Sequence, residues 1–190
     1  MDYKKTKELF EALISEGLEL DLNDPNLANT PTRLARMYRD EFVPDLQPPV
    51  LTVFPNEGFD EIIMLDNIPF VSLCSHHFLP FSGLAWFLYL PDKYLVGASK
   101  IARLIQYYGK RPQLQENMSI QIANHFCEVI EPKGMMLVMR AVHGCMSCRG
   151  VGTGMNAGMT TSLTRGTFRE DHIARDEAMS LIQLSISDRR

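Results

Sequence analysis

Long hydrophobic runs are missing from this sequence of 190 residues. No apolar stretch approaches the roughly 18 residues that a membrane-spanning helix needs, so we expect no membrane partner. The first residues, MDYKKTKELFEALISEG, carry lysines and acidic side chains on a helical pattern and lack the apolar core of a secretory signal. We therefore expect a cytoplasmic protein.

Positive charge, cysteine and repeated segments are also scarce. The formal net charge of −4 argues against broad binding to nucleic acid, although it leaves room for a local basic pocket. Only four cysteines are present, and cytoplasmic thiols are kept reduced, which favours metal binding or catalysis over a disulfide framework. A chain of this length without repeats fits one domain with a substantial core.

Two helices are expected at the N-terminus. Apolar residues recur at helical spacing between residues 4 and 16. A second helix is expected from Thr30, with Thr30 as its cap and Pro31 at its first position. The segment VPDLQPPVLTVFPNEG holds four prolines and indicates a surface connection. The sequence thus predicts a helical arm, residues 1–48, followed by a compact unit, residues 49–190.

The compact unit follows the order strand, strand, helix, helix, strand, strand, which predicts an α+β fold. The first two strands are expected to be separated by a turn at Ser82-Gly83, and the first of the two helices to be capped by Ser99. A glycine-rich loop, a further strand and a closing helix end the chain. The expected elements are strands at 61–74 and 83–91, helices at 99–111 and 114–130, strands at 135–145 and 159–168, and a last helix at 171–184.

Two clusters of cysteine and histidine indicate a metal site. Cys74 and His77 have the Cys-x2-His spacing, which can bring both side chains to one zinc ion. His143 and Cys145 are two apart on an expected strand, so their side chains would share a face. Cys145 is a candidate third ligand, which would leave the fourth position to water, as in a catalytic zinc site. Cys148 competes for this role, because a closed Cys3His site would be structural.

The remaining histidines of the two clusters, His76 and His143, are candidate acid–base groups, since an imidazole titrates near neutral pH. The alternative for His76 is that it only donates a hydrogen bond within a packed core. We interpret His125 as a residue on a helix face and His172 as part of the first turn of the last helix.

Several polar residues could bind a phosphorylated substrate with a polar ring. Lys100 and Arg103 lie on the same side of one expected helix, and Ser99 lies where that helix begins. Gln115 and Glu116 would offer an amide and a carboxylate to a ring edge, although a glutamate at a helix start commonly only complements the helix dipole. Arg149 directly follows the second metal cluster. Most charged residues on helices form only a solvated face.

Four ordered motifs together resemble the GTP cyclohydrolase I family. They are CSHH at 74–77, GASKIAR at 97–103, RPQLQEN at 111–117 and HGCMSCRG at 143–150. Thr30-Pro31-x-Arg33 and the late segment TTSLTRGTF match this family too. The resemblance runs from about Thr30 to the last helix and so covers most of the chain.

The resemblance implies a role for each candidate residue. It assigns one zinc ion per subunit to Cys74, His77 and Cys145, which disfavours Cys148 as a ligand. It assigns assistance in ring opening to two histidines, His76 and His143. It assigns guanine recognition to Gln115 and Glu116, and triphosphate contacts to Ser99, Lys100, Arg103 and Arg149.

The resemblance also implies a reaction and an assembly. Members of this family hydrolyse GTP, open the guanine imidazole ring, release formate and form 7,8-dihydroneopterin triphosphate for pterin biosynthesis. They adopt the tunnelling fold, a ββααββ unit whose antiparallel sheet carries helices on one face. Subunits join their sheets into a barrel-like ring, and two pentamers form a homodecamer with active sites between subunits.

Three departures from the family pattern keep other readings open. Ser75 stands where glutamate is usual, Asn117 stands where arginine is common, and the loop GVGTGMNAGM carries no charge. The alternatives are action on another purine nucleotide, a reaction that stops at the ring-opened formamide, or a catalytically inactive member that serves in assembly or pterin binding. A structural Cys3His module that uses Cys148 is a further alternative.

Overall fold

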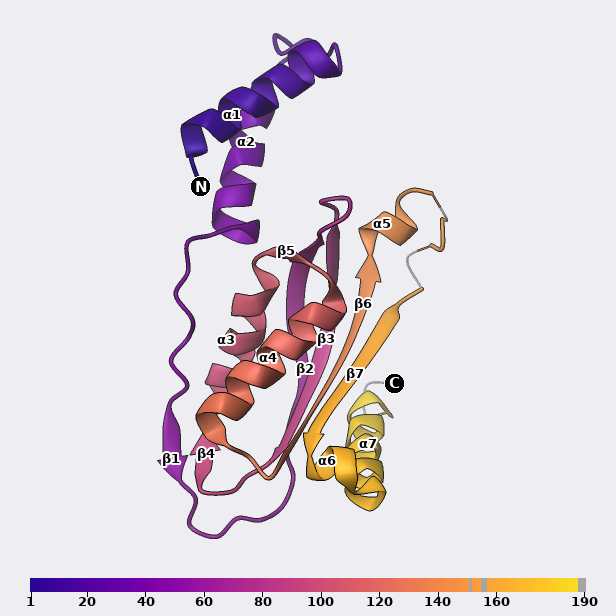
Figure 1. Ribbon diagram of the computed structural model, residues 1–190. Coiled ribbons are helices and arrows are strands. Elements are labelled where there is room, and N and C mark those ends of the chain that lie inside the picture. The colour runs from indigo at the N-terminus through magenta and orange to yellow at the C-terminus, as the bar shows by residue number, and fades with distance from the viewer. Residues whose placement is uncertain (151, 155–156, 188–190) are drawn as a thin grey trace.

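The structure is a computed structural model that describes residues 1–150, 152–154 and 157–187 (Figure 1). Its helices are α1 (Tyr3–Ala12), α2 (Thr30–Met37), α3 (Ala98–Gly109), α4 (Gln115–Ile130), α5 (Gly144–Ser147), α6 (Thr167–Glu170) and α7 (His172–Ser187), with π-helical turns η1 (Leu13–Gly17) and η2 (Tyr38–Phe42). Its strands are β1 (Val53–Pro55), β2 (Ile63–Cys74), β3 (Pro80–Leu90), β4 (Tyr94–Val96), β5 (Pro112–Gln113), β6 (Gly134–His143) and β7 (Met159–Gly166). Among these helices, none is long and apolar enough to cross a membrane.

One sheet organises the fold. Its strands lie in the order β5-β2-β3-β6-β7, and every neighbouring pair is antiparallel except the short parallel pair β2–β5. A separate two-stranded sheet pairs β1 with β4. The α+β class and the ββααββ order expected of the tunnelling fold are therefore confirmed.

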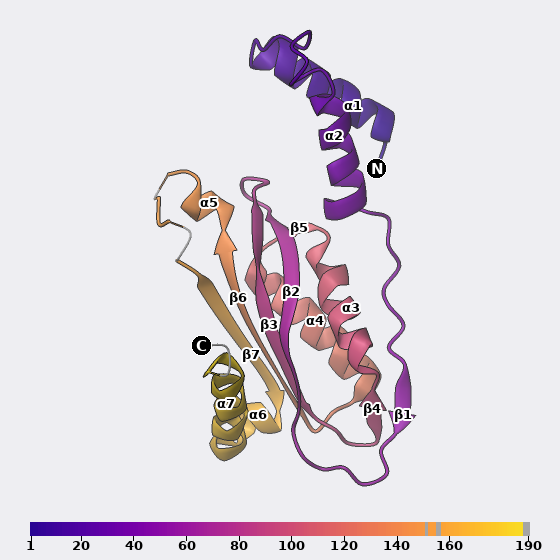
Figure 2. The same ribbon diagram turned by 180° about the vertical axis from the view of Figure 1, so that it is seen from behind.

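The two faces of the sheet pack against different helices. On β3, Phe87 and Tyr89 belong to the cluster that packs against α3 and α4, as expected for helices on one face. The alternate residues Trp86 and Leu88 belong to a second cluster that includes Phe168 of α6 and residues of α7. Figure 2 shows α6 and α7 on the face opposite α3 and α4. The C-terminal helices, which follow the ββααββ unit, thus cover part of the second face.

The reversal between β2 and β3 lies at residues 75–79, and the predicted turn at Ser82-Gly83 is wrong. Both residues lie inside β3, where Gly83 pairs with Ala141 of β6. A Cβ atom on Gly83 would come within 1.9 Å of the Arg140 carbonyl oxygen. This glycine therefore serves the close approach of two strands rather than a turn.

The N-terminal arm packs α1 against α2 at the end of the molecule that carries β5 (Figure 1). The Asp2 carboxylate accepts a hydrogen bond of 3.0 Å from the Lys5 amide and caps α1. Thr30 is already the first residue of α2, and its amide donates to the Leu27 carbonyl of the preceding turn, so the predicted Thr30 cap is wrong. Pro31 is the second residue of α2, one position later than predicted but still in its first turn.

Side-chain contacts join the arm to the rest of the chain. Lys110, directly after α3, forms an ion pair of 3.0 Å with Glu41 of η2. The ring of Tyr38 lies with its centroid 6.4 Å from that of Phe78, in the reversal between β2 and β3. The arm therefore reaches the turn that carries the first candidate metal ligands.

Candidate metal centre and active site

The turn after β2 brings Cys74 and His77 together. Cys74 is the buried last residue of the strand, and its carbonyl oxygen accepts a hydrogen bond of 2.9 Å from the Phe78 amide. Phe78 has a φ of 53°, a left-handed conformation that is uncommon for a bulky residue. The chain thus reverses within a few residues and turns the His77 ring back toward the Cys74 thiol.

Cys145 approaches from a helix, so the prediction that His143 and Cys145 share one strand face is wrong. Strand β6 ends at His143, and Cys145 lies in the first turn of α5. At Gly144 a Cβ atom would lie 2.9 Å from the Pro80 carbonyl oxygen, so only a glycine lets the chain bend this close to β3. The helical turn, rather than strand alternation, directs Cys145 toward the other two residues.

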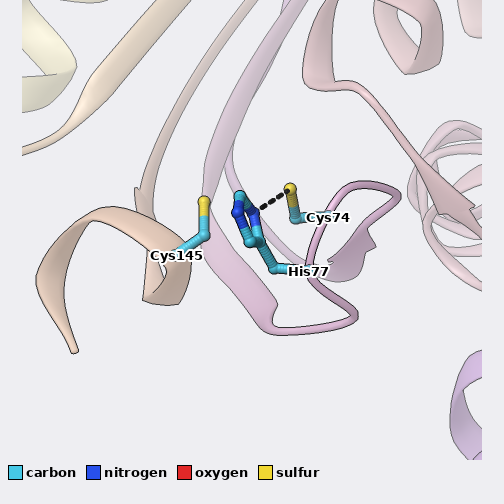
Figure 3. Close-up of side chains that lie close together, drawn as sticks. All are labelled: Cys74, His77 and Cys145. Carbon is cyan, nitrogen blue, oxygen red and sulfur yellow. Dashed lines mark hydrogen bonds between the residues drawn. The ribbon is translucent and has the colours of Figure 1, made fainter. Parts of the chain in front are cut away.

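Cys74, His77 and Cys145 form one compact group (Figure 3). Their ligand atoms all lie within 4.8 Å of one another, and Cys74 Sγ is 3.9 Å from His77 Nδ1. In a tetrahedral zinc site the corresponding sulfur–nitrogen separation is about 3.6 Å. Two thiols and one imidazole at these distances fit a single metal ion after a small contraction. This group could therefore bind a metal.

The number of protein ligands distinguishes a catalytic zinc site from a structural one. Three protein ligands are typical of a catalytic zinc site, whereas structural sites are closed by four. Cys148 is exposed at the end of α5, with its Sγ 3.6 Å from Ser147 Oγ, and it is not a member of the group. The geometry favours the open arrangement over the Cys3His alternative.

Without a metal, burial and then a hydrogen bond with Cys74 raise the pKa of the Cys145 thiol, while the nearby Arg149 guanidinium opposes this effect. A bound cation reverses this tendency, because it stabilises the thiolates that coordinate it. The exposed Arg149 therefore lies close enough to act on the metal centre electrostatically.

His143 is held beside this centre in a defined orientation. Only 8% of its surface is exposed, and its ring stacks on Phe81 with centroids 4.5 Å apart and planes within 1°. Its Nε2 atom lies 2.9 Å from Gln115 Oε1. Burial lowers the pKa of His143, and the negative charge of Glu116 partly offsets this.

Gln115 and Glu116 begin α4 but face different surroundings. Gln115 is fully buried, and its amide nitrogen donates to the Met139 carbonyl and to Thr161 Oγ1, both at 3.0 Å. Glu116 is exposed and lines a shallow groove of about 250 Å³ with residues of α4 and β7. Only Glu116 of this pair therefore offers a free side chain to a ligand.

The other three histidines are placed as follows. His76 is exposed, with its ring centroid 6.1 Å from that of His77, so the alternative that it only donates a hydrogen bond within a packed core is wrong. His125 lies on α4, where its Nδ1 is 3.1 Å from the Tyr108 hydroxyl. His172 is the first residue of α7, as predicted.

The candidate phosphate ligands on α3 lie far from the metal centre within one chain. Ser99 and Lys100 lie in the first turn of α3, next to β4, and Arg103 lies midway along the helix. Gly97 rather than Ser99 occupies the capping position, so the predicted cap is wrong. The other end of α3 leads to β5, which pairs with Cys74 (Figure 1). A helix of 12 residues spans about 18 Å. A single chain therefore does not bring Ser99 and Lys100 to the cluster.

Two residues of the site were not predicted from the sequence. Phe81 stacks on His143, and Thr161 accepts a hydrogen bond from Gln115. A phenylalanine and a threonine in strands carry no chemical signal by themselves. Only the pairing of β3 with β6, and of β6 with β7, places them here.

Comparisons with known proteins agree with this geometry. The family model described as GTP cyclohydrolase I matches residues 6–183. The GTP cyclohydrolase 1 of Caldanaerobacter subterraneus subsp. tengcongensis is 41% identical, covering 93% of this chain and 96% of its own. That of Lysinibacillus sphaericus is 36% identical, with 97% and 98% covered.

The solved structures give a weaker likeness. A chain of the archaeosine synthase QueF-Like in the apo form has a TM-score of 0.45 at 12% identity and covers 55% of this chain and 93% of its own. The assignment rests instead on the family model and on relatives that match over nearly the whole length. This chain belongs to the GTP cyclohydrolase I family of enzymes.

Proposed function

We propose that this protein hydrolyses GTP in a zinc-dependent reaction that opens the guanine imidazole ring, releases formate and rearranges to 7,8-dihydroneopterin triphosphate. The observation that carries the proposal is the Cys74–His77–Cys145 group, next to the buried His143, in a chain of this family. When bound, zinc would act as a Lewis acid and bring the pKa of a water molecule to about 7.

Two histidines are proposed to move protons. His143, fixed by Phe81 and Gln115, would exchange a proton with the ring nitrogen N7 of guanine as the ring opens. His76 is exposed beside His77 and would assist the hydrolysis from the solvent side of the turn. His76 directly precedes His77 and His143 lies two positions before Cys145, which supports this assignment.

Recognition of guanine is proposed to rest on Glu116. Its exposed carboxylate can accept hydrogen bonds from the ring N–H and the amino group of guanine, and adenine lacks this pair of donors. The groove that Glu116 lines is a suitable place for a planar base. Gln115, which the resemblance pairs with Glu116, is already hydrogen-bonded inside the protein.

The triphosphate is proposed to lie between subunits. Arg149 lies near the metal centre of its own chain. Ser99 and Lys100 begin α3 and Arg103 lies midway along it, whereas the far end of this helix leads to β5 beside Cys74. A neighbouring chain would supply these three residues. In the described part of a single chain, β7 and most of β2 leave an unpaired edge, which supports a ring of joined sheets. We propose the homodecamer of two pentamers that the family resemblance implies.

We also propose how the chain divides into domains and where in the cell the protein is located. We propose a helical arm of residues 1–48 and a catalytic unit of residues 49–190, supported by the extended segment between η2 and β1. We propose a cytoplasmic protein, because its four cysteines are free and two of them would have to be reduced to bind zinc.

The test is to incubate the purified, zinc-loaded protein with GTP and to measure formate and dihydroneopterin triphosphate in the same sample. Parallel samples contain ATP, a chelator or the His143→Ala variant. Stoichiometric formate and pterin from GTP, absent in all three parallel samples, are expected. Formate without pterin would mean that the reaction stops after ring opening. No formate from folded, zinc-loaded protein would exclude hydrolysis of GTP and favour a role in binding or assembly.

A further inference from the structure

The hydrogen bonds of Gln115 determine which way its side-chain amide points. One end of the amide faces the Met139 carbonyl oxygen at 3.0 Å, and the other end faces His143 Nε2 at 2.9 Å. A carbonyl oxygen only accepts hydrogen bonds, so the group facing Met139 must be the amide nitrogen. The side-chain oxygen of Gln115 therefore faces His143.

This orientation in turn fixes the proton on His143. The Gln115 oxygen is an acceptor, so a 2.9 Å hydrogen bond requires that His143 Nε2 carry a hydrogen. Nε2 is therefore the donor toward Gln115, and this hydrogen bond fixes the orientation of the imidazole ring. The hydrogen-bond partner of a ring nitrogen thus decides whether that nitrogen carries a hydrogen.

Thr161 completes this arrangement from β7. Its hydroxyl oxygen lies 3.0 Å from the Gln115 amide nitrogen and 3.3 Å from Ser119 Oγ, so the second amide hydrogen of Gln115 has an acceptor. Gln115 is fully buried, and both of its amide hydrogens are used within the protein. It has no free donor with which to read a base.

We propose that Gln115 is a positioning residue for His143: oriented by the Met139 carbonyl and Thr161, its side-chain oxygen accepts a hydrogen bond from Nε2 and holds the imidazole ring in one orientation. This inference rests on the proposed function, because it assigns the proton transfer to His143. It differs from the role in guanine recognition that the family resemblance implies for Gln115.

The variant Thr161→Val tests the inference without touching His143 or Gln115. Valine has nearly the same shape as threonine but cannot accept the hydrogen bond from Gln115. We expect kcat for GTP to fall about three- to tenfold, which corresponds to one hydrogen bond, while KM stays within about twofold. The control is Thr160→Val, because the exposed Thr160 precedes Thr161 on β7 and points to the other face of the sheet.

Variants of Gln115 separate positioning from recognition. Gln115→Leu removes the acceptor and is expected to lower kcat about a hundredfold, within the range of general acid–base contributions, with little change in KM. Gln115→Glu keeps an acceptor toward Nε2 and is expected to retain more of kcat than the leucine variant. If Gln115 read guanine, KM for GTP would rise and kcat would change little.

Neutron diffraction from crystals of the deuterated, zinc-loaded wild-type protein gives an answer that does not depend on turnover. Deuterium on Nε2 of His143, directed at Gln115, is expected. Deuterium on Nδ1 with none on Nε2 would overturn the inference, as would a Thr161→Val variant with unchanged kcat. If wild type releases no formate from GTP, the proposed function fails, and the neutron map still decides the orientation of Gln115 and His143.

Discussion

Phe81 and His143 lie face to face on neighbouring strands, with ring centroids 4.5 Å apart and planes within 1°. Phe81 is 1% exposed, so this stacking closes one side of the imidazole from water. The candidate metal ligand Cys145 follows two residues later, after the bend at Gly144. One aromatic side chain of β3 therefore orients the histidine next to the metal centre.

Replacing Phe81 by leucine tests this relationship. The variant keeps an apolar side chain but loses the flat surface under His143, so we expect kcat for GTP to fall several-fold. The free energy of unfolding should fall by about 1–2 kcal/mol, because some buried volume is lost. Phe87→Leu is the matched control, since Phe87 is equally buried on β3 but packs on Phe126. An equal loss of kcat in both variants would contradict a specific role for Phe81.

Exchange of single cysteines tests the composition of the metal centre. Cys145→Ser should lose most of its zinc on dialysis, because one of three protein ligands is weakened, whereas Cys148→Ser should keep one zinc ion per chain. Zinc and protein are quantified in the same samples by elemental analysis. Retention of zinc by Cys145→Ser together with its loss from Cys148→Ser would instead support the structural Cys3His site.

The packing of Tyr38 against Phe78 predicts that the arm supports the metal turn. Tyr38→Ala removes the aromatic neighbour of Phe78, which holds a φ of 53° directly after His77. We expect the affinity for zinc to fall, by less than about tenfold, because the turn becomes less constrained. Tyr3→Ala is the control, since Tyr3 contacts Arg39 within the arm. Competition with a chromophoric chelator measures both affinities, and equal values in the two variants would refute the coupling.

Gly83→Ala should be among the most destabilising single substitutions in the chain. Its new Cβ would lie 1.9 Å from the Arg140 carbonyl oxygen, so β3 and β6 would have to separate. A loss of more than about 3 kcal/mol in the free energy of unfolding is expected, measured by denaturant titration. Gly17→Ala is the control, because its nearest neighbour is the end of the Leu13 side chain at 3.4 Å. A change of less than about 1 kcal/mol at both glycines would show that the strands tolerate the extra atom.

Active sites between subunits can be tested by complementation. Lys100→Ala and His143→Ala are expected to be nearly inactive alone, because each removes one half of the proposed site. In randomly mixed oligomers, about one quarter of the sites combine an intact His143 with an intact Lys100 from the neighbouring chain. Coexpressed chains with separate affinity tags, purified through both tags, should therefore regain activity. Mixed oligomers as inactive as either variant would place both residues in one chain.

Local patterns in the sequence were enough to predict most of the fold. Alternating and helical periodicities predicted the ββααββ order. The spacing of Cys74 and His77 predicted two members of the group that could bind a metal, and the family resemblance favoured Cys145 over Cys148 as the third. The periodicities and the spacing of Cys74 and His77 depend only on neighbours within a few residues. The turn at Ser82-Gly83 was mispredicted, because a glycine that permits a turn also permits the close approach of two strands.

The contacts that orient the site could not be read from the sequence. The hydrogen bond between Gln115 and His143 joins residues 28 positions apart, and that between Gln115 and Thr161 joins residues 46 apart. Each depends on the register of β6 with β7 and on how α4 packs against them. Even the location of Cys145 on a helix depends on a close contact between Gly144 and β3.

The most direct measurement is the rate of formate release from GTP as a function of zinc occupancy. Metal-free protein is reconstituted with increasing zinc, and the bound zinc and the formate are measured in each sample. The account predicts a rate that rises in proportion to occupancy and levels off at one zinc ion per chain, with none in the metal-free sample. Formate release by metal-free protein, or its absence from a folded oligomer with one zinc per chain, would contradict the account.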